Sequence, residues 1–417
     1  MRSEFQPAMA NEAEPTTVTV DGLVPNRVVE PERPVDVASF LADAAAEGLA
    51  VAPFGGATSL ALGNLPERLD VCLSTARLRG IIDYEPTDLT LSVAAGSRFA
   101  DVQAVLAEHG QTLPIEVPHP ERATIGGLVA TAIAGPRRYG AGTLRDLLIG
   151  ISAAHPSGTV TKAGGMVVKN VTGFDLMRLY LGSLGTLGVV VSANFKVLPL
   201  PRFEATLLAA FHSLSDAFDA ARRIRASRVH PVSLEIARQA DDSWLLAARI
   251  EGREATVRLL TAETRELVAA DATVLEASDG KEWWRSYVAD QEVAAGPDEA
   301  SFRCTCQPSA TAEVVMRALA TADHDISLQH VMISPGLGTL LLRARFLAAN
   351  PREQFAAFRD ALLALSDHVV VVAADPARKR DLDVWGRTPQ TIEVMRDIKQ
   401  EFDPHRVLNP GRFAGFL

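Results

Sequence analysis

Glycine-rich loops are the parts of this sequence best suited to chemistry, because bare main chain can bind an anion. Residues 53–59, 124–127, 135–140 and 182–188 are rich in glycine, and apolar stretches separate them. Glycine has no Cβ, so its backbone can lie close to a flat or anionic group, and exposed N–H groups are natural partners of phosphate. We expect residues 124–197 and the loop at residues 53–59 to form one binding site for a dinucleotide.

The first loop reads Pro-Phe-Gly-Gly-Ala-Thr-Ser over residues 53–59 and follows a predicted strand. It contains no acidic residue, and it offers consecutive N–H groups and the hydroxyls of Thr58 and Ser59. A backbone nest of this kind suits a pyrophosphate. A plain tight turn explains the same residues, and the spacing leaves both interpretations open.

The spacing Gly182-x-x-Gly185-x-x-Gly188 resembles a nicotinamide fingerprint but has the wrong context. That fingerprint needs a strand before it and a helix after it, whereas here a predicted helix precedes and a predicted strand follows. A phosphate loop of the Gly-x-x-x-x-Gly-Lys-Ser/Thr type is also absent from the sequence. The pattern therefore favours FAD over NAD.

Composition limits the class of protein. The 417 residues are expected to form two or three domains, and 47% hydrophobic with 22% charged residues is ordinary for a globular chain. The formal net charge of −10 argues against nucleic-acid binding, which normally requires a basic patch. Three cysteines, Cys72, Cys304 and Cys306, are too few for a disulfide framework or a four-thiolate site within the chain. For Cys304 and Cys306 we favour small buried residues over a redox or metal pair.

The N-terminal residues 1–17 carry several glutamates and no apolar core, so we expect a disordered tail and not a signal peptide. No apolar run approaches the roughly 20 residues of a membrane span. These features predict a cytoplasmic protein without a membrane span.

The elements that must position the loops follow from the hydrophobic pattern. Residues 18–200 alternate predicted strands and helices, and Pro199 and Pro201 mark the expected domain boundary. Residues 201–387 repeat strand–helix–strand units, which predicts an α+β domain with an antiparallel sheet and helices on one face. Residues 388–417 add a helix and a tail that returns to the first domain. We expect residues 279–299 to form an irregular loop.

The order of these motifs resembles the FAD-binding domain of the vanillyl-alcohol oxidase/p-cresol methylhydroxylase (PCMH) class. The resemblance covers roughly residues 18–200 and rests on Pro53-x-Gly-Gly-x-Thr-Ser, Ala123-Thr-Ile-Gly-Gly-Leu-Val-Ala and Gly182-Ser-Leu-Gly-Thr-Leu-Gly-Val-Val. More narrowly, residues 164–175 and Gly135-Pro-Arg-Arg resemble the FAD-binding subunit of bacterial glycolate oxidase. The ending Phe402-Asp-Pro-His-Arg-Val-Leu-Asn-Pro-Gly-Arg resembles the tails of both flavin-type subunits of that enzyme.

The resemblance implies an α+β fold, with a two-lobed PCMH-type FAD-binding domain followed by a ferredoxin-like domain of the FAD-linked oxidase C-terminal type. It implies that residues 55–59 wrap the pyrophosphate, that residues 124–127 follow the phosphates and ribityl chain, and that residues 185–189 lie near flavin and adenosine. The implied FAD-binding residues are Pro53, Gly55, Gly56, Ala57, Thr58, Ser59, Thr124, Ile125, Gly126, Gly127, Arg138, Gly185, Gly188, Val189, Asn409 and Arg412.

Several side chains keep two interpretations under this resemblance. Arg137 and Arg138 neutralise the phosphates or a substrate carboxylate, or they form a solvated surface pair. Lys169 and Asn170 face the flavin ring or cap a helix. Asn409 and Arg412, named above, contact the flavin or only pin the tail between domains. A Gly126→Val change is expected to abolish FAD retention, because its side chain would occupy the space of the ribityl–phosphate chain.

Departures from the family pattern limit the catalytic assignment. Many relatives tether the flavin through a histidine, but nothing in the spacing marks His119 as a tether, so we expect non-covalent FAD. Related dehydrogenases carry closely spaced metal-binding histidines, whereas His324 and His330 stand six residues apart without that pattern. We therefore expect no metal site, and no general base can be named.

The resemblance implies an FAD-binding subunit of a complex that oxidises glycolate, a small 2-hydroxy acid, in glycolate catabolism. Its implied partners are a catalytic flavoprotein subunit and an iron–sulfur subunit, with the complex lying in the cytoplasm or against the inner face of the membrane. Two alternatives stay open: a stand-alone FAD-dependent oxidoreductase for another hydroxy acid or alcohol, and an assembly subunit without flavin.

Overall fold

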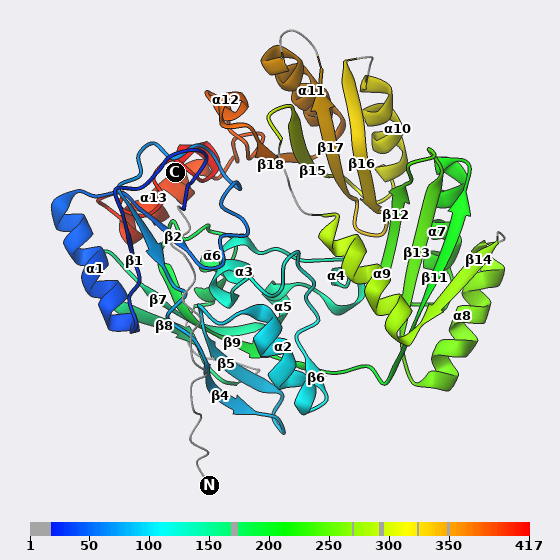
Figure 1. Ribbon diagram of the computed structural model, residues 1–417, viewed down its shortest axis with the longest axis horizontal. Coiled ribbons are helices and arrows are strands. Elements are labelled where there is room, and N and C mark those ends of the chain that lie inside the picture. Colours follow the sequence, from blue (N-terminus) through cyan, green and yellow to red (C-terminus); the bar gives the residue numbers. More distant parts are fainter. Residues whose placement is uncertain (1–17, 168–173, 269–270, 292–295, 323–324, 348–350) are drawn as a thin grey trace.

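The structure is a computed structural model that describes residues 18–167, 174–268, 271–291, 296–322, 325–347 and 351–417. The predicted tail at residues 1–17 therefore lies outside the described residues. Two groups of sheets are built from successive stretches of chain, and Figure 1 shows them on either side of helix α9. Within the described ranges, no helix is long and apolar enough to cross a membrane.

A small parallel sheet begins the fold. Strands β1 (Arg27–Val29), β3 (Val71–Ser74) and β2 (Val51–Phe54) lie side by side in that order. Helix α1 (Pro34–Glu47) packs its apolar face near them; it begins with proline and ends at Gly48, whose φ of 68° is the left-handed value that glycine adopts without strain. Strand β2 leads directly into the loop at residues 55–59.

A five-stranded antiparallel sheet follows. Its order is β4 (Ile81–Glu85), β5 (Thr90–Ala94), β9 (Val189–Lys196), β7 (Leu148–Ala154) and β8 (Val160–Gly164). Helices α2 (Phe99–Glu108) and α3 (Ile125–Thr131) bury apolar residues against it. Short helices α4 (Arg138–Ala141), α5 (Leu144–Leu147) and α6 (Met177–Tyr180) and the pair β6 (Gln111–Thr112) and β10 (Leu198–Pro199) complete this half.

An eight-stranded antiparallel sheet forms the second half and confirms the predicted α+β class. Its order is β14 (Ala272–Glu276), β11 (Phe203–Phe211), β13 (Trp244–Gly252), β12 (Ser233–Arg238), β16 (Ile326–Ser334), β17 (Thr339–Phe346), β15 (Glu299–Thr305) and β18 (His368–Ala374). Helices α7 (Leu214–Ala226), α8 (Glu254–Val268), α10 (Thr311–Thr321) and α11 (Pro351–Leu365) cover one face over the largest apolar core.

The prediction of an irregular loop at residues 279–299 is wrong for residues 279–289. Helix α9 (Ala277–Ala289) occupies most of this stretch and lies on the other face of the eight-stranded sheet. Its Trp284 and Tyr287 are buried against Ala247 and Met332 of that sheet. Burial of these aromatic side chains stabilises the helix. The polar residues around them in the sequence do not indicate it.

The chain ends with α12 (Pro376–Lys379), α13 (Ile392–Phe402) and the 3-10 turn Ala414–Phe416. The tail after α13 lies beside β2: Val51 N donates to Val407 O at 2.7 Å, and Asn409 N donates to Val51 O at 2.9 Å. In Figure 1 the red C-terminal elements accordingly lie against the blue N-terminal ones. The last residues therefore reach the loop that follows β2.

Candidate functional site

One cavity brings together most residues that the sequence singled out. Residues 53–59 after β2, Thr124 and Gly127 of the α3 region, and Asn409 and Arg412 of the tail all line it. A narrower extension continues between residues 53–55 and the loop before β9, where Gly126, Gly185 and Val189 line it. Segments more than 300 residues apart in the sequence thus form a single cavity.

Three of the residues predicted to bind the cofactor lie outside this cavity. Ile125 is buried in the core under α3. An added Cβ at Gly188 would come within 3.1 Å of His155, so this glycine serves packing. Arg138 instead reaches the eight-stranded sheet, where its Nη2 donates to Thr339 Oγ1. None of the three lines the cavity or its extension.

The glycines of these loops mostly serve contacts between protein segments. An added Cβ at Gly55 or Gly56 would overlap atoms of residues 122–124, at 2.0 and 1.8 Å. At Gly126 it would lie 2.9 Å from Ala95 Cβ, so the physical reason given for the Gly126→Val prediction is wrong. At Gly127, by contrast, the nearest atom is Thr124 Oγ1 at 3.3 Å, and the rest of the space is open. Gly127 is therefore the glycine whose missing side chain leaves room in the cavity.

The C-terminal tail holds the loop before β9. Asn409 Nδ2 donates to Leu184 O at 2.7 Å, and Lys399 Nζ, on α13, donates to Thr186 O at 2.8 Å and to Leu408 O at 2.9 Å. Asp403 Oδ2 accepts from the same ammonium group at 2.6 Å. Sequence reasoning missed Lys399, and no motif could have marked it, because two of its acceptors are main-chain carbonyls.

A second cavity of about 780 Å³ opens between the two halves of the molecule. Residues 117–119 line both this cavity and the one described above. Helix α9 forms the opposite wall through Lys281, Trp284 and Arg285. The shared wall makes the two cavities neighbours at the junction of the two halves.

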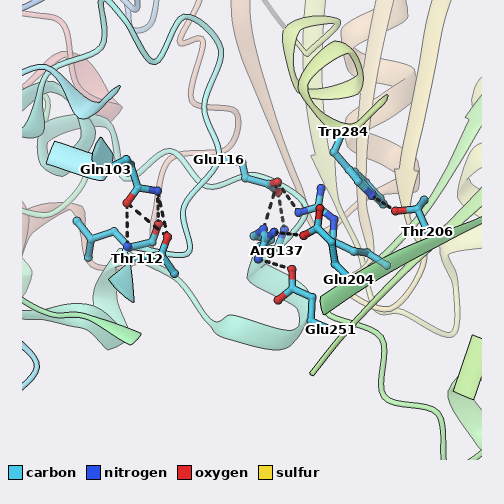
Figure 2. A network of polar contacts seen from close by, with 10 residues as sticks. Gln103, Thr112, Glu116, Arg137, Glu204, Thr206, Glu251 and Trp284 are labelled. Atoms are coloured by element: carbon cyan, nitrogen blue, oxygen red, sulfur yellow. Dashed lines mark hydrogen bonds and ion pairs between the residues drawn. The ribbon is translucent and has the colours of Figure 1, made fainter. Parts of the chain in front are cut away.

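A buried ionic network crosses this junction, and Figure 2 shows Arg137 at its centre. Arg137 Nε lies 3.3 Å from Glu116 and its Nη2 lies 3.2 Å from Glu204, while Nη1 contacts Glu251. Arg249, which is 2% exposed, donates to Glu116 at 2.7 Å. Arg137 is therefore neither a phosphate ligand nor part of a solvated pair in this structure, because its guanidinium joins the two halves.

Trp284 forms one side of this network. Its ring centroid lies 4.1 Å from the guanidinium carbon of Arg249, and its Nε1 donates to Thr206 Oγ1 at 2.8 Å. The indole therefore holds the arginine plane from one face. This contact explains the position of α9 beside the network.

A polar cluster lies on the face of the eight-stranded sheet that α9 covers. Glu235 accepts from Tyr287 Oη at 3.0 Å and from Ser334 Oγ at 2.8 Å. Burial raises the pKa of Glu235 to about 8, although the hydrogen bonds and Arg138 oppose that rise. The carboxyl is therefore largely neutral at pH 7.

Two arginines accompany this cluster. Burial lowers the pKa of Arg138, and Glu235 opposes that change. Burial also lowers the pKa of Arg303, and the positive charge of Arg138 lowers it further. Arg138 and Arg303 come from different halves of the chain and lie near enough to affect each other's charge, and Arg138 also lies near Glu235.

The sequence left chemical roles open for several histidines, cysteines and loop residues. Within the described ranges, no group of three or more His, Cys, Asp or Glu side chains could hold a metal ion. His324, Lys169 and Asn170 lie outside the described residues, so their predictions stay open. All three cysteines are free and buried, and burial raises the pKa of the Cys304 thiol to about 12. His119 lines both cavities.

Each half of the chain matches the model of a known domain family. Residues 25–164 match the family model of an FAD binding domain, and residues 200–325 with 378–413 match the C-terminal domain of FAD linked oxidases. Glycolate oxidase subunit GlcE of Escherichia coli (strain K12) is 37% identical over 195 residues, which is 46% of this chain and 53% of that protein. The match thus spans about half the length of that relative.

Two further comparisons cover more of the chain. D-2-hydroxyglutarate dehydrogenase of Xanthomonas citri pv. viticola is 28% identical over 411 residues, which is 88% of this chain and 84% of that protein. The solved structure of an alkyldihydroxyacetonephosphate synthase superimposes with a TM-score of 0.70 over 92% of this chain and 75% of its own, at 17% identity. The last likeness shows a shared fold.

Proposed function

We propose that this chain, which belongs to the FAD-linked oxidoreductases, is the FAD-binding subunit of a complex that oxidises glycolate or another small 2-hydroxy acid. FAD is the cofactor of the two domain families that it matches. The 37% identity with a glycolate oxidase subunit supports the role in a complex. We keep the proposed division into residues 18–200, 201–387 and 388–417; the second match begins at residue 200, which supports the first boundary.

The residues of the loop cavity fit FAD. Its phosphate loop lacks acidic side chains and adds the hydroxyls of Thr58 and Ser59. Asn409 and Arg412 line the same cavity, and their buried Oδ1 and Nε atoms have no hydrogen-bond partner among the described residues. An amide oxygen and a guanidinium donor without partners are costly unless a ligand or water satisfies them. We propose that these groups and the main chain at residues 55–59 bind the dinucleotide without a covalent tether.

The proximity of two arginines from different halves of the chain supports the substrate class. Arg138 in the first half and Arg303 on β15 affect each other's charge, and Glu235 is the acidic group that acts on Arg138. Guanidinium groups bind carboxylates with paired, charge-assisted hydrogen bonds. We propose that the positive charge of these two arginines attracts the carboxylate of a hydroxy acid; neither side chain lines the cavity that we assign to FAD.

Bound FAD supplies the acceptor for the two electrons that leave the carbinol carbon. The protein contributes positive charge that attracts the acid and a junction that the Arg137 network holds together. A general base is not assigned among the described residues. In an accessory role for this chain, the partner flavoprotein supplies the general base.

Purified chain tests this proposal. Alone it is expected to carry one FAD and to oxidise glycolate only weakly, and addition of the partner flavoprotein and iron–sulfur subunits is expected to raise turnover. An Arg303→Gln variant should lower turnover of the assembled complex through KM for the acid, while exposed Arg345→Gln on a neighbouring strand serves as its control. Brisk glycolate oxidation by the isolated chain would contradict the accessory role.

A stand-alone FAD-dependent dehydrogenase is the second candidate, because the hydroxyglutarate dehydrogenase match covers 84% of that relative. Anaerobic bleaching of the flavin by a panel of 2-hydroxy acids and alcohols would support it. Absence of bleaching by every compound would reject it. An assembly subunit without flavin is tested by extraction, since stoichiometric FAD excludes it. A cytoplasmic location, with partners against the membrane, is part of the first proposal.

A further inference from the structure

Two buried cations bind four consecutive carbonyl groups just after the phosphate loop. The acceptors are the carbonyl oxygens of residues 60–63. Arg412 Nη2 donates to the first and the third at 2.6 Å each. Lys379 Nζ, at the end of α12, donates to the second and, at 3.3 Å, to the fourth. The carbonyls therefore alternate between a guanidinium and an ammonium group.

Asp21 is the acidic partner of both cations. Its Oδ1 accepts from Lys379 Nζ at 2.7 Å, and its Oδ2 lies 3.9 Å from Arg412 Nη2. The side chains of Lys379 and Asp21 are 0% and 3% exposed. The cluster of two cations and one carboxylate carries a net charge of +1 beneath the turn.

The turn at residues 60–63 continues the phosphate loop without interruption. Leu60, Leu62 and Arg412 line the same cavity as residues 53–59, whereas Lys379 does not reach it. Because a peptide unit is planar, an acceptor fixed on one side also fixes the N–H group on the other. The peptide unit whose carbonyl Lys379 binds at residue 61 donates its N–H group, that of Leu62, to Ser59 O at 3.2 Å, so the bonds of Lys379 help to hold the end of the phosphate loop.

We propose that Lys379 is a positioning residue for the diphosphate of FAD. It acts through the turn at residues 60–63 and contributes the surplus positive charge of the cluster. Without its ammonium group two buried carbonyls and Asp21 lose a donor, and the turn must rearrange to find others. The inference rests on FAD as the cofactor and not on the oxidation of a hydroxy acid.

A merely structural role for Lys379 makes a different prediction. If the lysine only fastened α12 to the first half of the chain, its loss would lower stability and affect every part of the cofactor site alike. A positioning role at the diphosphate affects ligands that carry the diphosphate and spares those that lack it. Riboflavin and ADP separate the two cases, because each is a fragment of FAD and only ADP contains a diphosphate.

The experiment compares full-length apoprotein of the wild type, Lys379→Met, Lys379→Arg and Arg359→Met. Arg359 is a control for the loss of a buried cation that does not bond the turn itself: it is 9% exposed and donates to the carbonyls of Asp383 and Gly386, whereas Asn64, the residue after the turn, bonds the carboxylate of Asp383. Circular dichroism confirms folding, and calorimetric titration gives Kd for FAD, ADP and riboflavin.

Lys379→Met is expected to weaken FAD and ADP by roughly tenfold or more, which is the scale of one lost charge-assisted hydrogen bond. Riboflavin should change by less than about threefold, Lys379→Arg should lie between, and Arg359→Met should bind all three ligands like the wild type. A folded Lys379→Met protein with wild-type affinity for FAD would overturn the proposal. So would an equal loss for riboflavin and ADP. Wild-type protein that binds no FAD would overturn the cofactor assignment together with it.

Discussion

Replacing Gly127 by alanine should stabilise the apoprotein and weaken FAD binding at the same time. Gly127 lies in the first turn of α3, and an added Cβ would meet only Thr124 Oγ1 at 3.3 Å before the open cavity. Alanine is up to about 1 kcal/mol more favourable than glycine in a helix. Because Thr124 Oγ1 must shift by a few tenths of an ångström to admit the methyl group, the apoprotein should gain only about a few tenths of a kcal/mol in its free energy of unfolding.

The same methyl group intrudes on the space that we assign to the cofactor. Overpacking a filled site by one methyl typically costs about 1–3 kcal/mol, which corresponds to an affinity loss of roughly fivefold to more than a hundredfold. Denaturant unfolding of the apoprotein and fluorescence titration with FAD measure the two effects separately. Opposite signs in the two assays are the diagnostic result.

Gly126→Ala is the matched control, one residue away on the same helix. Its Cβ would lie 2.9 Å from Ala95 Cβ and 3.2 Å from Ala95 O, inside the protein. This variant should lose about 1–3 kcal/mol of apoprotein stability. If Gly127→Ala bound FAD as tightly as the wild type, or if both variants shifted stability equally, our assignment of the cavity would be wrong.

Three further perturbations test the surroundings of the site. Arg137→Met removes the cation shared by Glu116, Glu204 and Glu251. It should lower the free energy of unfolding in urea by about 3–5 kcal/mol. As a control, Arg202→Met at an exposed position should change that free energy by less than about 0.5 kcal/mol. Because burial raises the pKa of Glu235 above its unfolded value of 4.5 to about 8, its contribution to stability is fully present below pH 4.5 and lost as pH rises toward 8. Glu235→Gln should flatten that part of the Tm–pH profile, and an unchanged profile would refute the assignment. Lys399→Met should loosen residues 403–417 in hydrogen exchange and weaken FAD, while Arg396→Met on the exposed side of α13 should do neither.

The order of elements and the loops that form the cavity could be predicted from sequence. Runs of alternating apolar residues predict strands, and glycine with hydroxyl residues after a strand predicts a phosphate loop, because both signals depend on neighbours a few residues apart. Helix α9 was missed for the same reason: its segment is locally polar, and its aromatic side chains are buried by residues of distant strands, among them Ala247 and Met332.

The tertiary structure alone decided which side chains line the cavity that we assign to the cofactor. Gly126 and Gly127 are neighbours in one sequence motif and cannot be told apart there. A Cβ added at Gly126 would meet Ala95, whereas one added at Gly127 would enter the cavity. The neighbours Arg137 and Arg138 likewise diverge, to an ionic network and to the eight-stranded sheet. The bond from Lys379 to Asp21 spans 358 residues of sequence. Local pattern cannot encode such partners, since each depends on how whole elements pack after the chain has folded.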